Sequence, residues 1–229
     1  MEKIIKEKGT EVYIVREWIK KKEADKLMDD LMEKIDWEQK WNEKFACNEP
    51  RLAFSLRDEK DGKGNPIVHN YSGVKTKFDC WDEKSIIGLK NEDIYCQVRG
   101  YRDRIEKETY LYHDSCSFQY YRTGDDYVAY HQDKEIQNAI SKTEDIKPTK
   151  TVICLTLGAT RRFLLRRWHP ETKERKNMEV FEVYINSGDV LVMEGNCQKT
   201  FEHCVPPMKS KKNPVGPRIS ITFRLLGEY

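Results

Sequence analysis

The second half of this sequence is a series of short segments rich in β-branched and aromatic residues, each bounded by turn residues. Segments of this kind are typical of strands. Many short strands separated by turns favour a sandwich or barrel of β-structure. The predicted strands are Cys116–Tyr121, Tyr127–His131, Thr151–Leu157, Arg162–Arg167, Met178–Ile185, Asp189–Met193, Lys199–His203 and Arg218–Leu226.

The first half has a different residue pattern, which predicts helices. After a short extended start at Glu11–Val15, apolar residues recur at the three-and-four spacing of an amphipathic helix from Ala24 to Ile35. A second, weaker helix is predicted from Ile94 to Ile105. Between the two helices, Pro50–Val74 is rich in Gly, Asp, Lys and Asn, which predicts a long hairpin or lid with a flexible tip.

Length and composition indicate one intracellular domain. The 229 residues are enough for a core without disulfides, and seven cysteines without a C-x-x-C pair favour a reducing compartment. Neither the N-terminus nor any later segment has an apolar run long enough for a signal peptide or a membrane span. We expect a monomer that is not membrane-bound, and the sequence leaves nucleus and cytoplasm equally open.

The net charge of +2 hides local excesses of positive charge. One basic stretch runs from Arg161 to Lys176, and a second, Lys209–Lys212, follows soon after His203. Such clusters suit a phosphate backbone, although a solvated surface is the commoner explanation for any one of them.

His131, Asp133 and His203 are candidate metal ligands. Residues two apart in a strand point to the same side, so His131 and Asp133 can bind one ion, while His203 arrives from another predicted strand. Two imidazoles and one carboxylate leave one face of an iron octahedron open, as oxygen-activating Fe(II) enzymes require. Structural zinc and calcium sites use other donor sets. An H-x-D pair alone also occurs by chance in many chains.

The predicted C-terminal strand adds a second unusual pattern. Alternation places apolar residues on one side and Arg218, Ser220, Thr222 and Arg224 on the other. A polar stripe is usually a solvated strand face. However, a guanidinium is also the group that grips a carboxylate through two hydrogen bonds, so a carboxylate clamp is the alternative.

Four segments resemble, in the same order, motifs of the AlkB family of Fe(II)- and 2-oxoglutarate-dependent dioxygenases, of the type that repairs alkylated nucleic acids. They are SFQYYRTGDDYVAYHQDKE (Ser117–Glu135), TLGATRRF (Thr156–Phe163), GDVLVMEGNCQKTFEHCVP (Gly188–Pro206) and GPRISITFR (Gly216–Arg224). The resemblance implies an α+β, mainly β fold in a single domain, 1–229. It divides the chain into N-terminal helices with a nucleotide-recognition lid (1–114) and a double-stranded β-helix, or jelly-roll, catalytic core (115–229).

The resemblance also implies the cofactors. Fe(II) would be held by His131, Asp133 and His203, and the cosubstrates would be 2-oxoglutarate and dioxygen. Cosubstrate contacts are implied at Gln119, Tyr121, Arg218, Ser220 and Arg224. Of these, Arg218 matches the family arginine that binds the remote carboxylate, and Tyr121 adds a hydroxyl donor to it. Gln119 departs from the Asn that is usual in the family.

The implied reaction is oxidative demethylation of N-alkylated bases, such as 1-methyladenine and 3-methylcytosine, in DNA or RNA, with release of formaldehyde. Substrate contacts are implied at Arg51, Phe54, Tyr71, Glu135 and Arg161. A base must leave its stack to reach buried iron, and a carboxylate favours a positively charged methylated base. For Glu135 and Arg161 a surface role without substrate is an equal alternative.

Two other functions stay open from the sequence. One keeps the iron chemistry but changes the substrate to 6-methyladenine RNA, protein or lipid. The other is a nucleic-acid-binding module whose metal site is structural or degenerate, which is disfavoured because a binding protein has no need for all three ligands and both arginines.

Overall fold

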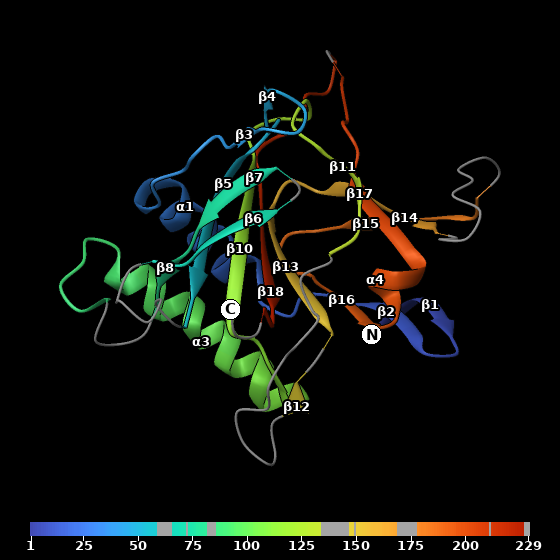
Figure 1. The fold of residues 1–229 in the computed structure, drawn as a ribbon, viewed down its shortest axis with the longest axis horizontal. Helices are drawn as coiled ribbons and strands as arrows, with labels where there is room; N and C mark the ends of the chain where they lie inside the picture. Colours follow the sequence, from blue (N-terminus) through green and yellow to red (C-terminus); the bar gives the residue numbers. More distant parts are fainter. Residues whose placement is uncertain are drawn as a thin grey trace.

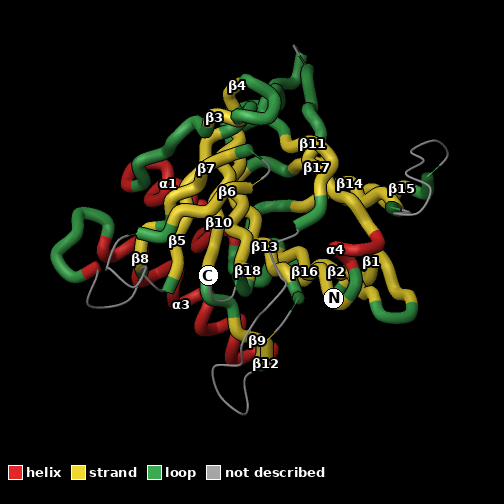
Figure 2. Tube along the Cα trace, in the orientation of Figure 1, coloured by secondary structure: helices red, strands yellow, loops and turns green. Residues whose placement is uncertain are grey.

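The protein folds as three layers, with helices, a large sheet and a smaller sheet packed in that order (Figure 1). The structure is a computed structural model that describes residues 1–58, 66–71, 73–81, 86–133, 147–148, 150–168, 178–210 and 212–226, with the main chain alone at 69–71 and 147–148. Figure 2 shows that strands dominate and that the two long helices, α1 (Lys21–Lys34) and α3 (Glu92–Thr109), lie on the same side of the large sheet. The fold is therefore α+β and mainly β, as predicted, with the jelly-roll core that the resemblance implies.

The large sheet has the strand order β1-β2-β16-β13-β18-β10-β5-β8. All neighbours in it are antiparallel except β5 and β8. In that order its strands span Glu2–Glu7, Thr10–Val15, Val190–Gly195, Val152–Gly158, Arg218–Arg224, Ser115–Tyr121, Leu52–Arg57 and Asp79–Cys80.

The smaller sheet has the antiparallel order β11-β17-β14-β15 and covers the other face of the large sheet. Its strands span Val128–His131, Phe201–Val205, Arg161–Arg167 and Val180–Ile185, and the one-turn helix α4 (Cys197–Thr200) leads into β17. Two minor sheets complete the described strands. One has the order β4-β3-β7-β6 (Cys47–Asn48, Trp41–Asn42, Val74–Lys77, Val68–Tyr71), and the other pairs β9 (Leu111–Tyr112) with β12 (Lys147–Pro148).

The two long helices form where apolar periodicity predicts them. Helix α1 (Lys21–Lys34) buries Ala24, Leu27, Met28 and Leu31, and α3 (Glu92–Thr109) buries a matching stripe. Both stripes pack on the apolar face of the large sheet. Because complete burial of a Leu side chain contributes about 1.5–3 kcal/mol, these contacts rather than helix propensity hold the layer in place.

Strand β18 lies at the centre of the large sheet, between β13 and β10. Its apolar residues Ile219, Ile221 and Phe223 join the core under the helices. Alternation turns the polar stripe toward the smaller sheet, where Arg218, Ser220 and Thr222 are buried. The solvated-face alternative for this strand is therefore wrong.

The structure differs from the sequence predictions at several elements. The sequence predicts Leu52–Arg57 as part of a lid, but this segment is an inner strand of the large sheet, where it pairs with β10 and buries Ser55, Leu56 and Arg57. In the described part of this region, β6 and β7 pair as an antiparallel hairpin. Residues 199–200 are helical rather than extended, and Glu2–Glu7 is an edge strand that the sequence did not predict. Strands before residue 115 thus complete the sheet that carries the site.

Within the described ranges, no helix is both long and apolar enough to cross a membrane.

Candidate metal and cosubstrate site

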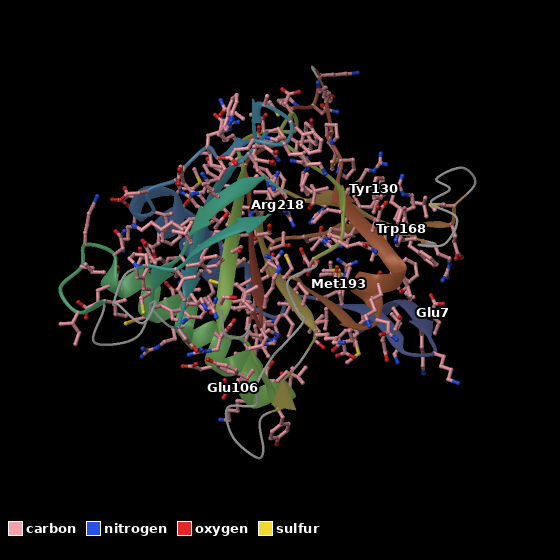
Figure 3. The ribbon with its side chains drawn as sticks, viewed as in Figure 1. Glu7, Glu106, Tyr130, Trp168, Met193 and Arg218 are labelled. Atoms are coloured by element: carbon pink, nitrogen blue, oxygen red, sulfur yellow. The ribbon has the colours of Figure 1, made fainter. Side chains whose placement is uncertain are left out.

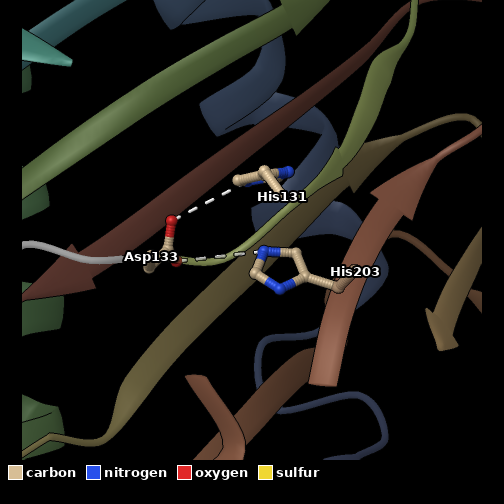
Figure 4. A group of neighbouring side chains, drawn as sticks. All are labelled: His131, Asp133 and His203. Carbon is tan, nitrogen blue, oxygen red and sulfur yellow. Dashed lines mark ion pairs between the residues drawn. The ribbon is translucent and has the colours of Figure 1, made fainter. Parts of the chain in front are cut away.

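The three predicted metal ligands come together between two strands of the smaller sheet. His131, at the end of β11, is the register partner of His203 in β17, and Asp133 follows two residues later. Nε2 of His131 lies 3.7 Å from Oδ1 of Asp133, and Nε2 of His203 lies 3.9 Å from Oδ2 (Figure 4). One donor atom from each residue lies within 4.8 Å of the others. In the described part of the chain this is the single such group of three.

Neighbouring groups fix the orientation of each ligand. The Ala129 carbonyl can only accept, so Nδ1 of His131 donates to it at 2.9 Å and Nε2 keeps its lone pair for a metal. The ring of Phe163 stacks on His203 with centroids 5.5 Å apart. The side chains of Asp133 and His203 are 5% and 6% exposed, whereas that of His131 is 37% exposed. The set is therefore open to solvent on the His131 side.

Arg224 holds the carboxylate of Asp133. Its Nε and Nη2 donate to Oδ2 and Oδ1 at 3.3 and 3.0 Å. Burial alone would raise the pKa of Asp133, but the charge of Arg224 lowers it below its ordinary value. Burial lowers the pKa of His203 to about 3, and His131 adds to the effect. Asp133 is thus anionic and His203 neutral near pH 7, the forms that bind metal ions.

Arg218 is the strongest indication of an anionic ligand. It is 2% exposed, and its Nη2 donates to Thr156 Oγ1 at 3.1 Å. Nε and Nη1 are buried and have no hydrogen-bond partner in the described residues. Leaving a buried charged donor unsatisfied is costly, so a ligand carboxylate is the natural partner. Figure 3 labels Arg218.

Tyr121 lies close to two buried guanidinium groups. The carbon at the centre of the Arg218 guanidinium is 5.1 Å from the centroid of the Tyr121 ring, and that of Arg161 is 5.4 Å away. Arg161 is 1% exposed and donates to the carbonyls of Thr123, Asp126 and Pro206 at 2.8–3.1 Å. Burial and the nearby charge of Arg218 lower the pKa of Arg161. Arg161 therefore holds main-chain loops here, instead of facing an open surface.

Gln119 and Ser220 are register partners on the same polar face, and Thr156 pairs with Ser220 from the other side. Nε of Arg51 donates to Oε1 of Gln119, while Nη1 of Arg51 donates to Glu49 at 2.7 Å. Because a guanidinium only donates, Oε1 of Gln119 is used by this bond. The amide nitrogen of Gln119 takes no part in this bond and keeps its N–H donors.

Of the other predicted substrate residues, Phe54, Tyr71 and Glu135, only Phe54 has a described side chain. Phe54 lies on the opposite face of the large sheet, with its ring centroid 5.6 Å from Phe118 and 5.8 Å from Tyr95. The prediction that Phe54 stacks on a base is therefore corrected. Successive residues of a strand point to opposite faces of the sheet, and Phe54 is on the face that packs against the helices. Tyr71 belongs to β6, but its side chain lies outside the described residues, as does Glu135 entirely.

Sequence reasoning did not single out Thr156 or Gln198. Thr156 lies at the start of the TLGATRRF motif, and its place opposite Ser220 follows only from the strand register. Gln198 accepts a hydrogen bond from the main-chain N–H of Asp133 at 2.9 Å. The only signal in the sequence was its position in the segment that leads to His203.

A jelly roll that holds two imidazoles, one carboxylate and a buried, partly unsatisfied arginine is the arrangement of the Fe(II)- and 2-oxoglutarate-dependent dioxygenases. The family model described as the 2OG-Fe(II) oxygenase superfamily matches residues 11–224. The chain belongs to this superfamily, and within it to the AlkB family.

The individual relatives share less than a third of their residues with this chain over the matched segments. The chain is 25% identical over 207 residues to the human protein named alpha-ketoglutarate-dependent dioxygenase alkB homolog 3, covering 89% of this chain and 62% of that protein. It is 29% identical over 130 residues to uncharacterized protein R406 of Acanthamoeba polyphaga mimivirus, covering 57% of this chain and 59% of that protein. The chain thus spans about three fifths of the curated relatives' length.

The fold is also similar to that in the solved structure of OsALKBH1. The TM-score is 0.54 at 15% sequence identity, and the match covers 97% of this chain and 99% of that chain. At this identity the similarity concerns the fold.

Proposed function

We propose that this chain is an Fe(II)- and 2-oxoglutarate-dependent dioxygenase that demethylates N-alkylated bases, 1-methyladenine and 3-methylcytosine, in DNA or RNA. The observation that carries the proposal is the triad His131, Asp133 and His203, whose carboxylate is held by Arg224 on the strand face that also buries Arg218. Two neutral imidazoles and a carboxylate suit Fe(II), and the unsatisfied donors of Arg218 suit a dicarboxylate.

When bound, Fe(II) with 2-oxoglutarate and dioxygen supplies an oxidant for C–H bonds, and the products are succinate, carbon dioxide and a hydroxylated methyl group that leaves as formaldehyde. The chain's own residues prepare this chemistry. Arg218, with the hydroxyl of Tyr121, binds the remote carboxylate and sets the orientation of the cosubstrate. Arg224 keeps Asp133 ionised and in place. Apolar residues of the smaller sheet exclude water from the space between the sheets.

A nucleic-acid substrate is supported by the AlkB membership and by the surface before Arg51. The β3–β4 hairpin exposes Trp41 and Phe45, which are 53% and 67% exposed. Nζ of Lys44 lies 5.3 Å from the centroid of the Phe45 ring. Exposed aromatic rings beside cations suit unpaired bases and phosphates. Arg51 follows this hairpin, and its charge acts on His131.

The test is mass spectrometry of short oligonucleotides after incubation with the protein, Fe(II), ascorbate and 2-oxoglutarate. Single- and double-stranded DNA and RNA would each carry 1-methyladenine, 3-methylcytosine or 6-methyladenine. We expect loss of the methyl group from 1-methyladenine and 3-methylcytosine, with one succinate formed for each methyl group removed. His131→Ala and Asp133→Ala are the controls, and both should abolish turnover with little change in folding.

Other results would change the proposal. Demethylation of 6-methyladenine alone would replace the proposed substrate. Slow formation of succinate without loss of any methyl group would leave an active iron centre with a protein, lipid or other substrate. If no succinate forms with Fe(II) present, the dioxygenase proposal itself is wrong.

A further inference from the structure

One side chain connects the segments that carry all three metal ligands. The main-chain N–H of Asp133 donates to Oε1 of Gln198 at 2.9 Å. Asp133 lies two residues beyond His131, the last residue of β11. Gln198 lies in α4, which continues directly into β17 and His203. A shift of Gln198 would therefore move the Asp133 main chain relative to both imidazoles.

The orientation of the Gln198 amide is determined by its two contacts. Because a peptide N–H donates, Oε1 of Gln198 is the acceptor, and its Nε2 is directed to Sδ of Met193 at 3.6 Å. Met193 belongs to β16 of the large sheet, is 2% exposed and is labelled in Figure 3. The glutamine thus spans from the large sheet to the loop of Asp133.

The helix that carries Gln198 is itself fixed. Cys197 is 1% exposed, and the main-chain N–H of Asn196 donates to the Gly9 carbonyl at 2.7 Å. Gly195 has a φ of +67°, and a Cβ there would lie 2.2 Å from the same carbonyl oxygen. The turn between β1 and β2 therefore holds the start of α4, so Gln198 offers its oxygen from a rigid base.

We propose that Gln198 is a positioning residue for the metal site. It holds the main chain of Asp133 while Arg224 holds the carboxylate, so that both ends of this residue are fixed before a metal binds. Removing an outer partner of a metal ligand typically costs 10- to 100-fold in metal affinity. This inference rests on the proposed function, because it requires that the triad binds a metal.

The experiment is a titration of the metal-free protein with Co(II), followed by the visible absorption of the bound ion. Gln198→Met keeps the length of the side chain but removes the acceptor, whereas Gln198→Glu keeps an acceptor. Lys199→Met, at an exposed position in the same helix, is the matched control. We expect Co(II) affinity to fall about 10-fold or more in Gln198→Met, and to stay close to wild type in Gln198→Glu and Lys199→Met.

The melting temperature of each metal-free variant separates positioning from general stability. The inference requires that Gln198→Met melts within a few degrees of wild type while its Co(II) affinity falls. Unchanged Co(II) affinity in Gln198→Met would overturn it, and so would a large loss of melting temperature that Gln198→Glu does not restore. If wild type itself fails to bind Co(II), or binds it equally well after Asp133→Ala, the proposed function falls and the inference falls with it.

Discussion

The hydrogen bonds of Arg218 indicate that this buried residue serves ligand binding rather than the stability of the fold. Its guanidinium has one protein hydrogen bond, to Thr156, and faces Tyr121, while two of its nitrogen donors have no partner in the described chain. A charge in this state costs stability in the protein without cosubstrate. The same unsatisfied donors become charge-assisted hydrogen bonds when a carboxylate enters, so Arg218 is suited to binding and not to the stability of the empty fold.

Arg218→Met should therefore separate binding from stability. Hydrogen bonds to a charged group contribute about 1.5–3 kcal/mol, so the KM for 2-oxoglutarate should rise about 10- to 100-fold. The free energy of unfolding without cosubstrate should stay constant or increase, because an apolar side chain replaces an unsatisfied charge. Succinate formation against 2-oxoglutarate concentration and urea denaturation measure the two effects. An unchanged KM would rule out Arg218 as the carboxylate ligand.

Gln119 and Arg51 should have coupled effects on the KM for 2-oxoglutarate. Arg51 donates to the amide oxygen of Gln119, so under the proposed function the amide N–H groups would be the donors to the cosubstrate. Gln119→Asn shortens the side chain and Arg51→Met removes its partner, so each should raise the KM for 2-oxoglutarate several-fold. In a double-mutant cycle the two effects should fall short of additivity by about 0.5 kcal/mol or more, as is usual for residues in contact. Fully additive effects would show that the two side chains act independently.

Strand β5 illustrates an element whose role the sequence conceals. Leu52–Arg57 follows a Pro-Arg pair and precedes a polar segment, so it resembles the start of a lid. In the structure its pairing with β10 places Phe54 and Leu56 in the core under the helices, while Ser55 faces Ser117 on the polar side. Strand β5 thus contributes apolar side chains to the core under the helices and a polar side chain to the opposite face of the sheet.

Phe54→Ala tests this assignment. A fully buried Phe→Ala change costs about 3–5 kcal/mol, and Phe54 is only partly buried, so we expect a loss of about 2 kcal/mol in the free energy of unfolding. Turnover per folded molecule should change by less than about twofold, since the ring points away from the triad. Denaturation and oligonucleotide demethylation at low temperature measure both. A large loss of turnover without loss of stability would mean that Phe54 contacts substrate.

The elements that sequence could predict are those with strong periodicity of their own. The alternation of β18 and the apolar stripes of α1 and α3 are properties of single segments, and the structure confirms them. Strand β5 and the edge strand β1 depend on a partner distant in sequence, so no local pattern indicated their place. For the same reason the triad could be proposed from residue types, whereas the bonds of Arg51 and Gln198 required the register between strands.

At the scale of the whole molecule, the site depends on a dry interior shared by both sheets. The large sheet is braced by helices on one face, and its other face carries the polar stripe against the smaller sheet. Neutral histidines are also buried outside the site. His113 lies just before β10, is fully buried, and donates from Nε2 to the Thr151 carbonyl at 3.1 Å next to β13. Such groups couple the stability of the fold to pH.

Stability should consequently fall in mild acid. Burial lowers the pKa of His113 from 6.5 to about 4. Between these values the unfolded chain binds a proton that the folded protein does not, so the stabilisation is complete above the unfolded pKa and is lost as pH falls toward 4. His113 alone should account for a loss of about 2 kcal/mol between about pH 7 and pH 5. His203, also buried and neutral, acts in the same direction in metal-free protein.

His113→Gln isolates this contribution, because the glutamine amide can still donate to Thr151 but does not titrate. Urea denaturation of the metal-free protein at the two pH values should show a smaller decrease in the variant than in wild type, by about 2 kcal/mol. The remaining decrease reports His203, because Asp133, whose pKa is lowered below its ordinary value, stays ionised in both states at these two pH values. If wild type and variant lose stability equally, His113 must bind its proton as readily in the folded protein as in the unfolded chain, and burial would not lower its pKa.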